Sequence, residues 1–143
     1  MIYENRKSSS AEKKAKKSLG KTFLPKDIDT TILQTLRYEY PQRKITTELI
    51  SPEFTCLCPF SGLPDFAKIT IRYIPRKKLI EMKSLKYYLT AYRNVKIYNE
   101  HAVNKILEDL KKVLNPHELI VIGEFTQRGG TTNTVTATYK ARR

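Results

Sequence analysis

The sequence has little of several residue types, and cysteine is the most informative of these. Its 143 residues include no tryptophan, two histidines and only two cysteines. Cys56 and Cys58 lie one residue apart, which is too close for a disulfide that closes a stabilising loop, so we expect reduced thiols, as in a cytoplasm. Together with His101 and His117 they match no familiar zinc spacing. The sequence therefore predicts no metal site.

Long apolar runs are also missing. No stretch approaches the roughly 20 consecutive apolar residues that a membrane-spanning helix requires, and the first residues lack the apolar core of a signal peptide. We therefore expect a soluble, cytoplasmic protein that has no membrane partner.

Acidic residues are scarce. The chain has 14 Asp and Glu against 27 Lys and Arg, which gives a formal net charge of +13. Residues 1–21 hold seven of the basic residues and few large apolar ones, so we interpret them as a flexible basic tail. Residues 22–143 suffice for a single domain. Their charge could serve RNA or the phosphates of a dinucleotide, and charge alone does not choose between these.

Hydrophobic periodicity predicts strands and helices in the rest of the chain. Apolar and polar residues alternate over 67–73, and apolar residues of 102–114 follow the spacing of an amphipathic helix that Asn99 caps and Asn115-Pro116 ends. The predicted order is strand 44–50, which ends at Ser51-Pro52, strand 67–73, helix 84–92, helix 99–114, strand 119–125 and strand 132–139. The last two strands are joined by a hairpin whose two glycines permit positive φ.

This order predicts an α+β fold, a four-stranded antiparallel sheet with two antiparallel helices on one face. Its two open edges invite pairing between subunits, so we expect a ring-forming homo-oligomer. Residues 23–41 are expected to pack loosely as a lead-in. Residues 54–66 contain two prolines and a glycine and are expected to form an irregular, shaped loop.

That loop carries a thiol and a carboxylate, Cys58 and Asp65, between two strands that hold its ends. A thiolate can attack an electrophilic carbon such as that of a nitrile, and a nearby carboxylic acid can supply the proton that such a step requires. For an isolated pair, the ordinary interpretation is a small buried thiol and a turn residue. The pair alone therefore does not establish an active site.

Two longer motifs add to this interpretation. Leu57-Cys58-Pro59 with Ser61-Gly62-Leu63-Pro64-Asp65-Phe66-Ala67, followed by Glu81-Met82-Lys83-Ser84-Leu85-Lys86-Tyr87-Tyr88, resembles the NADPH-dependent 7-cyano-7-deazaguanine reductases of queuosine biosynthesis. The resemblance runs from about residue 52 to 130. It implies the tunnelling fold, in which subunits form a barrel with active sites between neighbours, and a decamer of two pentameric rings. It also implies NADPH-dependent reduction of a nitrile to an amine, on the pathway to a tRNA modification.

The resemblance also implies roles for single residues. Cys58 matches the nucleophile that forms a thioimide, Asp65 matches the proton donor, and Cys56 matches a variable neighbour that faces the other way and packs in the core. The implied substrate contacts are Ile80, Glu81, Met82 and Glu100, with Asn99 as a weaker one. The implied cofactor contacts are Lys83, Ser84, Lys86 and Arg128. Many members place His directly before the recognising Glu, whereas this chain has Asn99-Glu100-His101.

Three alternatives remain open. A related enzyme forms the same thioimide on tRNA and transfers ammonia to make an amidine, but is not expected to carry the motif of residues 81–88. A zinc-dependent GTP cyclohydrolase of the same fold would need metal ligands that the sequence does not supply. A basic RNA-binding module could use tyrosines among lysines, as in Lys86-Tyr87-Tyr88, although these tyrosines have the spacing of a helix core. Nucleic acid is therefore not expected as a partner.

Overall fold

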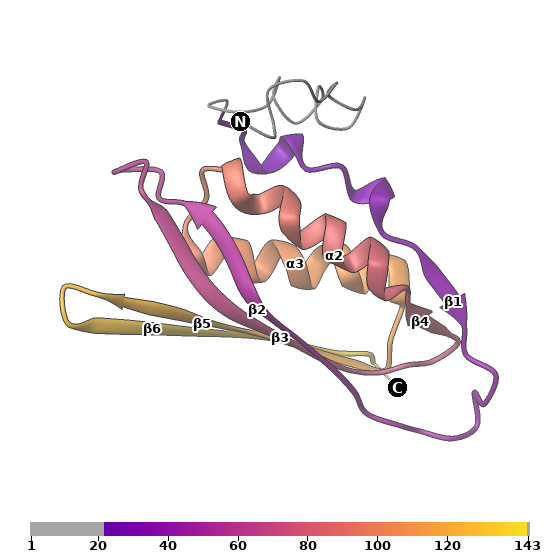
Figure 1. Ribbon diagram of the computed structural model, residues 1–143. Coiled ribbons are helices and arrows are strands. Elements are labelled where there is room, and N and C mark those ends of the chain that lie inside the picture. Colours follow the sequence, from indigo (N-terminus) through magenta and orange to yellow (C-terminus); the bar gives the residue numbers. More distant parts are fainter. Residues whose placement is uncertain (1–21, 143) are drawn as a thin grey trace, which may run out of the picture.

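The computed structural model describes residues 22–142, so the predicted tail of residues 1–21 lies outside the described residues. Four long strands form an antiparallel sheet in the order β2–β3–β5–β6. They are β2 (Thr47–Leu57), β3 (Pro64–Ile74), β5 (Glu118–Arg128) and β6 (Thr131–Lys140). Helices α2 (Met82–Thr90) and α3 (Asn99–Leu114) lie on one face of the sheet and run in opposite directions (Figure 1). The predicted α+β fold is confirmed.

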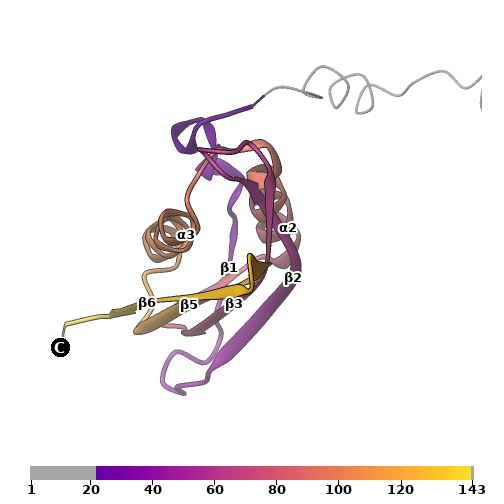
Figure 2. The ribbon, with the colours of Figure 1, turned by 90° about the vertical axis from the view of Figure 1, so that its left-hand side faces the viewer.

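The core lies between this face and the two helices. Helix α3 covers β5 and β6, whereas α2 lies over the β2 side of the sheet (Figure 2). The apolar stripe of α3 is buried as its periodicity predicted. Gly123 of β5 allows the close approach of α3, because a Cβ there would lie 2.7 Å from Val103 Cγ2 and 2.8 Å from Phe125 Cε2. Its lack of a side chain therefore sets the spacing between helix and sheet.

Strand β2 is longer than predicted and passes through Pro52. The register with β3 shifts between Ser51 and Phe54, which accommodates the proline. Because β2 is an edge strand, the missing N–H of Pro52 need not cost a ladder hydrogen bond. The expectation that proline would end the strand is therefore wrong. The irregular loop shrinks from 54–66 to residues 58–63, because both of its ends are paired strand.

The lead-in segment packs tightly, contrary to expectation. Ile28, Leu33 and Tyr38 are buried in it. It forms the short 3-10 helices η1 (Pro25–Asp27) and η2 (Thr30–Ile32) and strand β1 (Thr35–Arg37), which pairs antiparallel with β4 (Lys78–Ile80). This second, two-stranded sheet was not predicted. It fixes the chain that enters α2, because Glu81 N–H donates to the carbonyl of Gln34 at 2.9 Å.

The ends of α3 agree with the prediction except at its N-cap. Helix α2 starts after Glu81 and continues as the 3-10 helix η3 (Ala91–Asn94). The N-cap of α3 is Tyr98, so Asn99 is the first helical residue and the predicted cap is wrong. The predicted stop is confirmed, since Asn115 adopts a left-handed φ of 45° directly before Pro116.

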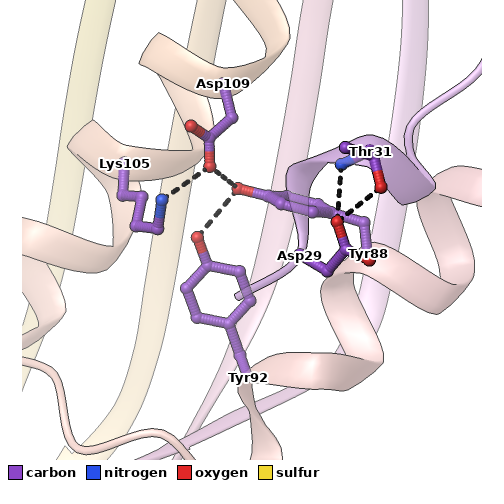
Figure 3. Close-up of polar contacts among 6 residues, drawn as sticks. All are labelled: Asp29, Thr31, Tyr88, Tyr92, Lys105 and Asp109. Carbon is purple, nitrogen blue, oxygen red and sulfur yellow. Dashed lines mark hydrogen bonds and ion pairs between the residues drawn. The ribbon is translucent and has the colours of Figure 1, made fainter. Parts of the chain in front are cut away.

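A buried polar network joins helices α2 and α3 (Figure 3). The Tyr88 hydroxyl donates to Asp109 Oδ2 at 2.6 Å and lies 2.9 Å from the Tyr92 hydroxyl. Lys105 Nζ reaches the same carboxylate oxygen at 2.9 Å. Burial raises the pKa of both tyrosines well above the usual value. The network therefore holds neutral phenols against a paired carboxylate and fixes α2 and η3 to α3.

No helix within residues 22–142 is long and apolar enough to cross a membrane.

Candidate active site

The predicted nucleophile lies in the short loop between β2 and β3. Cys58 N–H donates to the carbonyl of Leu63, and Gly62 N–H donates back to the carbonyl of Cys58. Gly62 has a φ of 72°, which a residue with a side chain rarely adopts. These local hydrogen bonds tie the six-residue loop closed and present Cys58 at the end of the sheet.

The surroundings of Cys58 favour its thiolate form. Hydrogen bonds from the Ser61 hydroxyl, from Ser61 N–H and from Phe60 N–H lower the pKa of the Cys58 thiol, against smaller opposing effects of burial and of Asp65. Donors aimed at sulfur stabilise the charged form over the neutral one. Ser61 belongs to the family motif of residues 57–67, but the sequence alone did not predict that it lowers the pKa of the Cys58 thiol.

Asp65 lies beside this loop and is paired with an arginine. Its carboxylate Oδ1 is 2.8 Å from Nε of Arg128, and its side chain is only 13% exposed. The Arg128 guanidinium also donates to the carbonyl of Pro64. Arg128, predicted to contact the cofactor, is thus located at the predicted proton donor, at the end of β5.

Cys56 does not face away from the site as expected. It is the cross-strand partner of Asp65, and it is fully buried, which agrees with the expected core packing. Burial raises the pKa of the Cys56 thiol to about 12, with smaller effects from Asp65 and Cys58. Its Sγ lies 3.9 Å from the carbonyl oxygen of Ile97. Cys56 is therefore a neutral thiol beneath the site, whereas Cys58 is the activated one.

A contact between distant segments brings Cys58 towards the start of α3. Leu57 pairs in parallel with Lys96, with N–H donation from Leu57 to Val95 and from Ile97 to Leu57. The predicted substrate contacts Asn99 and Glu100 follow within a few residues. This pairing places the thiol loop and the first turn of α3 at the same end of the molecule.

Both α3 residues have side chains suited to a ligand. Asn99 Oδ1 is buried and has no hydrogen-bond partner in residues 22–142, and a buried acceptor of this kind requires an explanation such as a bound donor. Glu100 is exposed, and its Oε1 accepts from Nδ2 of Asn133 on β6 at 3.1 Å. Asn133 carries no signal in the sequence, because only the fold brings β6 to α3.

The other predicted substrate contacts, residues 80–82, do not lie near the Cys58 loop within one chain. Ile80 is buried and donates its N–H to the Tyr73 hydroxyl, and Met82 is exposed. Glu81 caps α2 by accepting from Lys83 N–H and Ser84 N–H, which lowers the pKa of its carboxyl. Residues 80–82 lie at the start of α2, whereas the Cys58 loop contacts the segment that follows η3. The substrate segment and the thiol are therefore separated by the length of α2, about 13 Å, and by η3.

A groove lies between β2 and α2 and contains the predicted cofactor lysines. Its volume is about 830 Å³, within the range of ligand sites. Lys83, Lys86 and Arg93 line it from the helical side, and Glu48 and Glu53 line it from β2. No described residue forms an ion pair with the three cations, whereas Glu48 is paired with Arg72. Lys83 and Lys86 reach the groove from α2, and Arg93 reaches it from η3.

Ser84 differs from the two lysines. Its hydroxyl accepts from Gln34 N–H at 3.0 Å and donates to the carbonyl of Glu81 at 2.8 Å, and its side chain is buried. It does not line the groove. The hydroxyl therefore holds the lead-in segment against α2, and this arrangement does not support the predicted cofactor contact.

Comparison with known proteins establishes the family. The family model described as QueF-like protein matches residues 64–143. A NADPH-dependent 7-cyano-7-deazaguanine reductase of Caldicellulosiruptor bescii is 58% identical over 113 residues, which cover 79% of this chain and 86% of that protein. The reductase of the same name from Thermoanaerobacter pseudethanolicus is 52% identical, covering 83% and 90%. The chain belongs to this reductase family.

The fold of this reductase family member agrees with that of a solved structure. A crystal structure of the archaeosine synthase QueF-Like in the apo form matches with a TM-score of 0.60 and 22% identity, and covers 70% of this chain and 96% of that one. At that identity the likeness shows the fold alone. Within residues 22–142, no three His, Cys, Asp or Glu side chains gather as a metal site.

Proposed function

We propose that this chain is an NADPH-dependent reductase that converts the nitrile of 7-cyano-7-deazaguanine to an aminomethyl group, within queuosine biosynthesis. The observation that carries this proposal is the activated thiol of Cys58 beside the ion-paired Asp65, in the loop that matches the family motif. Residues 22–143 form the reductase domain. We also propose a cytoplasmic location, because both cysteines are free thiols.

Cys58 and Asp65 divide the chemistry of the first step. The Cys58 sulfur adds to the nitrile carbon and its proton ends on the nitrile nitrogen, so a thioimide forms with no net oxidation or reduction. Asp65 can take the thiol proton as a carboxylate and pass it to the nitrogen as an acid.

The α3 residues would bind the heterocycle. A glutamate accepts two hydrogen bonds from an aminopyrimidinone edge, and Glu100 is held by Asn133 in a position to do so. The unpartnered Oδ1 of Asn99 offers one further acceptor. Asn99 stands where many members have His, so an amide acceptor replaces an imidazole there.

The groove fits the cofactor. NADPH, when bound, supplies a hydride twice, which makes the reduction a four-electron one. Lys83, Lys86 and Arg93 would hold its phosphates, because their charges lie on one face of a groove of suitable volume. Arg93 was not identified from the sequence, because it lies in η3, beyond the end of α2.

We further propose a homo-oligomer, a decamer of two pentameric rings, whose active sites lie between subunits. Strands β2 and β6 are open edges in the described chain. The segment Ile80–Met82 lies away from Cys58 in one chain, and a neighbour that supplies this segment would complete the site. If so, mixing Cys58→Ala subunits with Glu81→Ala subunits restores activity that neither variant has alone.

The proposal is tested with purified protein, 7-cyano-7-deazaguanine and NADPH. We expect two NADPH oxidised per nitrile, the amine as product, and neither in Cys58→Ala. Cys56→Ala is the matched control and keeps the covalent adduct, because its thiol is neutral and buried. A Cys58 adduct without NADPH consumption would favour the amidine-forming reaction, and no adduct at all would refute the proposed chemistry.

A further inference from the structure

Arg128 contacts two successive residues at the start of β3. Its Nε lies 2.8 Å from Asp65 Oδ1, and its terminal nitrogen donates to the carbonyl of Pro64. A guanidinium that binds at two points has a defined orientation, which a point charge cannot reproduce. The Asp65 side chain is 13% exposed, so its carboxylate is largely shielded by this partner and by the surrounding strands.

The hairpin geometry places Arg128 there. The register of β5 with β6 shifts between Phe125 and Arg128, and the strand then turns through Gly129 and Gly130, whose φ values are 56° and 80°. Neither glycine has an atom within 4 Å of an added Cβ, so the glycines serve the turn alone. The turn directs the last residue of β5 back towards the β2–β3 loop.

Within one chain, the groove that we assign to the cofactor lies apart from Arg128. Lys83 and Lys86 line it, but Arg128 does not. The charge of Arg128 is already matched by Asp65, whereas the groove cations have no partner among residues 22–142. The sequence resemblance implied a cofactor contact for Arg128, whereas its contacts within one chain are with Asp65 and Pro64.

We propose that Arg128 is a positioning residue for Asp65 in thioimide formation, the step that precedes any hydride transfer. This inference rests on the proposed function. Arg128 fixes the carboxylate beside the Cys58 loop, where it can accept the thiol proton and pass it on. Loss of the guanidinium releases Asp65 and slows the addition of sulfur to the nitrile, even when no NADPH is present.

The test measures adduct formation without NADPH. The protein is mixed with 7-cyano-7-deazaguanine, quenched at intervals, and the covalent adduct is quantified by intact-protein mass. We expect Arg128→Ala to form the adduct on the order of 10²-fold more slowly, the loss typical of a misplaced catalytic group. Arg128→Lys keeps the charge and the fold but not the two-point contact, and loses most of the rate as well. Millimolar guanidinium partly restores the rate of Arg128→Ala.

Lys68→Ala is the matched control. Lys68 forms an exposed ion pair with Glu124 at 3.0 Å between the same two strands, and its loss leaves adduct formation unchanged with or without guanidinium. Adduct formation at the wild-type rate in Arg128→Ala, together with a raised KM for NADPH, would overturn the inference in favour of a cofactor contact. No adduct in the wild-type protein would overturn the proposed function, and this inference with it.

Discussion

Replacement of Tyr88 by Phe tests the polar network that joins the helices. The change removes one hydroxyl and two hydrogen bonds, the 2.6 Å bond to Asp109 and the 2.9 Å bond to Tyr92. A hydrogen bond to a charged group contributes about 1.5–3 kcal/mol, and a neutral one about 1 kcal/mol. Asp109 keeps Lys105, but the Tyr92 hydroxyl is left buried without this partner. We expect a loss of about 2–4 kcal/mol in the free energy of unfolding.

Equilibrium urea unfolding, followed by circular dichroism at one protein concentration, measures this loss. With a slope of about 2 kcal/mol/M, the midpoint falls by about 1–2 M. Tyr87→Phe is the matched control, because Tyr87 is the neighbouring residue of α2 and is 56% exposed. Its effect should stay within about 0.5 kcal/mol. Equal midpoints for the two variants would refute the idea that the network stabilises the packing of α2.

Three further predictions concern the site. Ser61→Ala raises the pKa of the Cys58 thiol, so the thiolate is populated only at higher pH; the pH midpoint of adduct formation moves up while the plateau rate remains. Arg93→Ala raises the KM for NADPH roughly fivefold, as expected for about 1 kcal/mol, and leaves kcat at saturation unchanged. Asn133→Ala frees Glu100 and raises the KM for the nitrile substrate by a similar factor, measured in steady-state kinetics.

Each of these has a contradicting outcome. An unshifted pH profile in Ser61→Ala would mean that the backbone amides alone activate the thiol. Arg142→Ala is the control for Arg93→Ala, because Arg142 is exposed and does not line the groove. If both variants raised the KM for NADPH equally, the effect of Arg93 would come from the net charge of the protein and not from a contact in the groove. Thr134→Ala, an exposed neighbour on β6, controls for disturbance of that strand.

Local patterns in the sequence predicted those parts of the fold that local physics decides. The apolar spacing of 102–114, the alternation of 67–73 and the glycines at 129 and 130 each depend on neighbouring residues, and the structure confirms each. The expectation that Pro52 would end the strand was wrong, because the effect of a proline depends on whether the strand lies at an edge. Edge position is a property of the sheet and cannot be read from the residues that flank a proline.

The candidate site divides in the same way. Cys58, Asp65, Lys83 and Lys86 were found from two contiguous motifs. Asn133, the partner of Glu100, was not identified from the sequence, and Arg128, the partner of Asp65, was assigned to the cofactor. Both contacts depend on the β5–β6 hairpin, which brings these residues to distant parts of the chain. The packing of the lead-in segment was missed for the same reason, since β1 acquires its partner from β4.

The parallel pairing of Leu57 with Lys96 has a consequence for the order of folding. The hairpin of β2 and β3 closes a six-residue loop, so the hydrogen bonds around Cys58 can form early. The pairing with Lys96 spans about 40 residues and must wait until α2 and η3 have docked, because long loops close at a greater entropic cost. We therefore expect a folding chain to acquire a reactive thiol before it acquires the place where a substrate is bound.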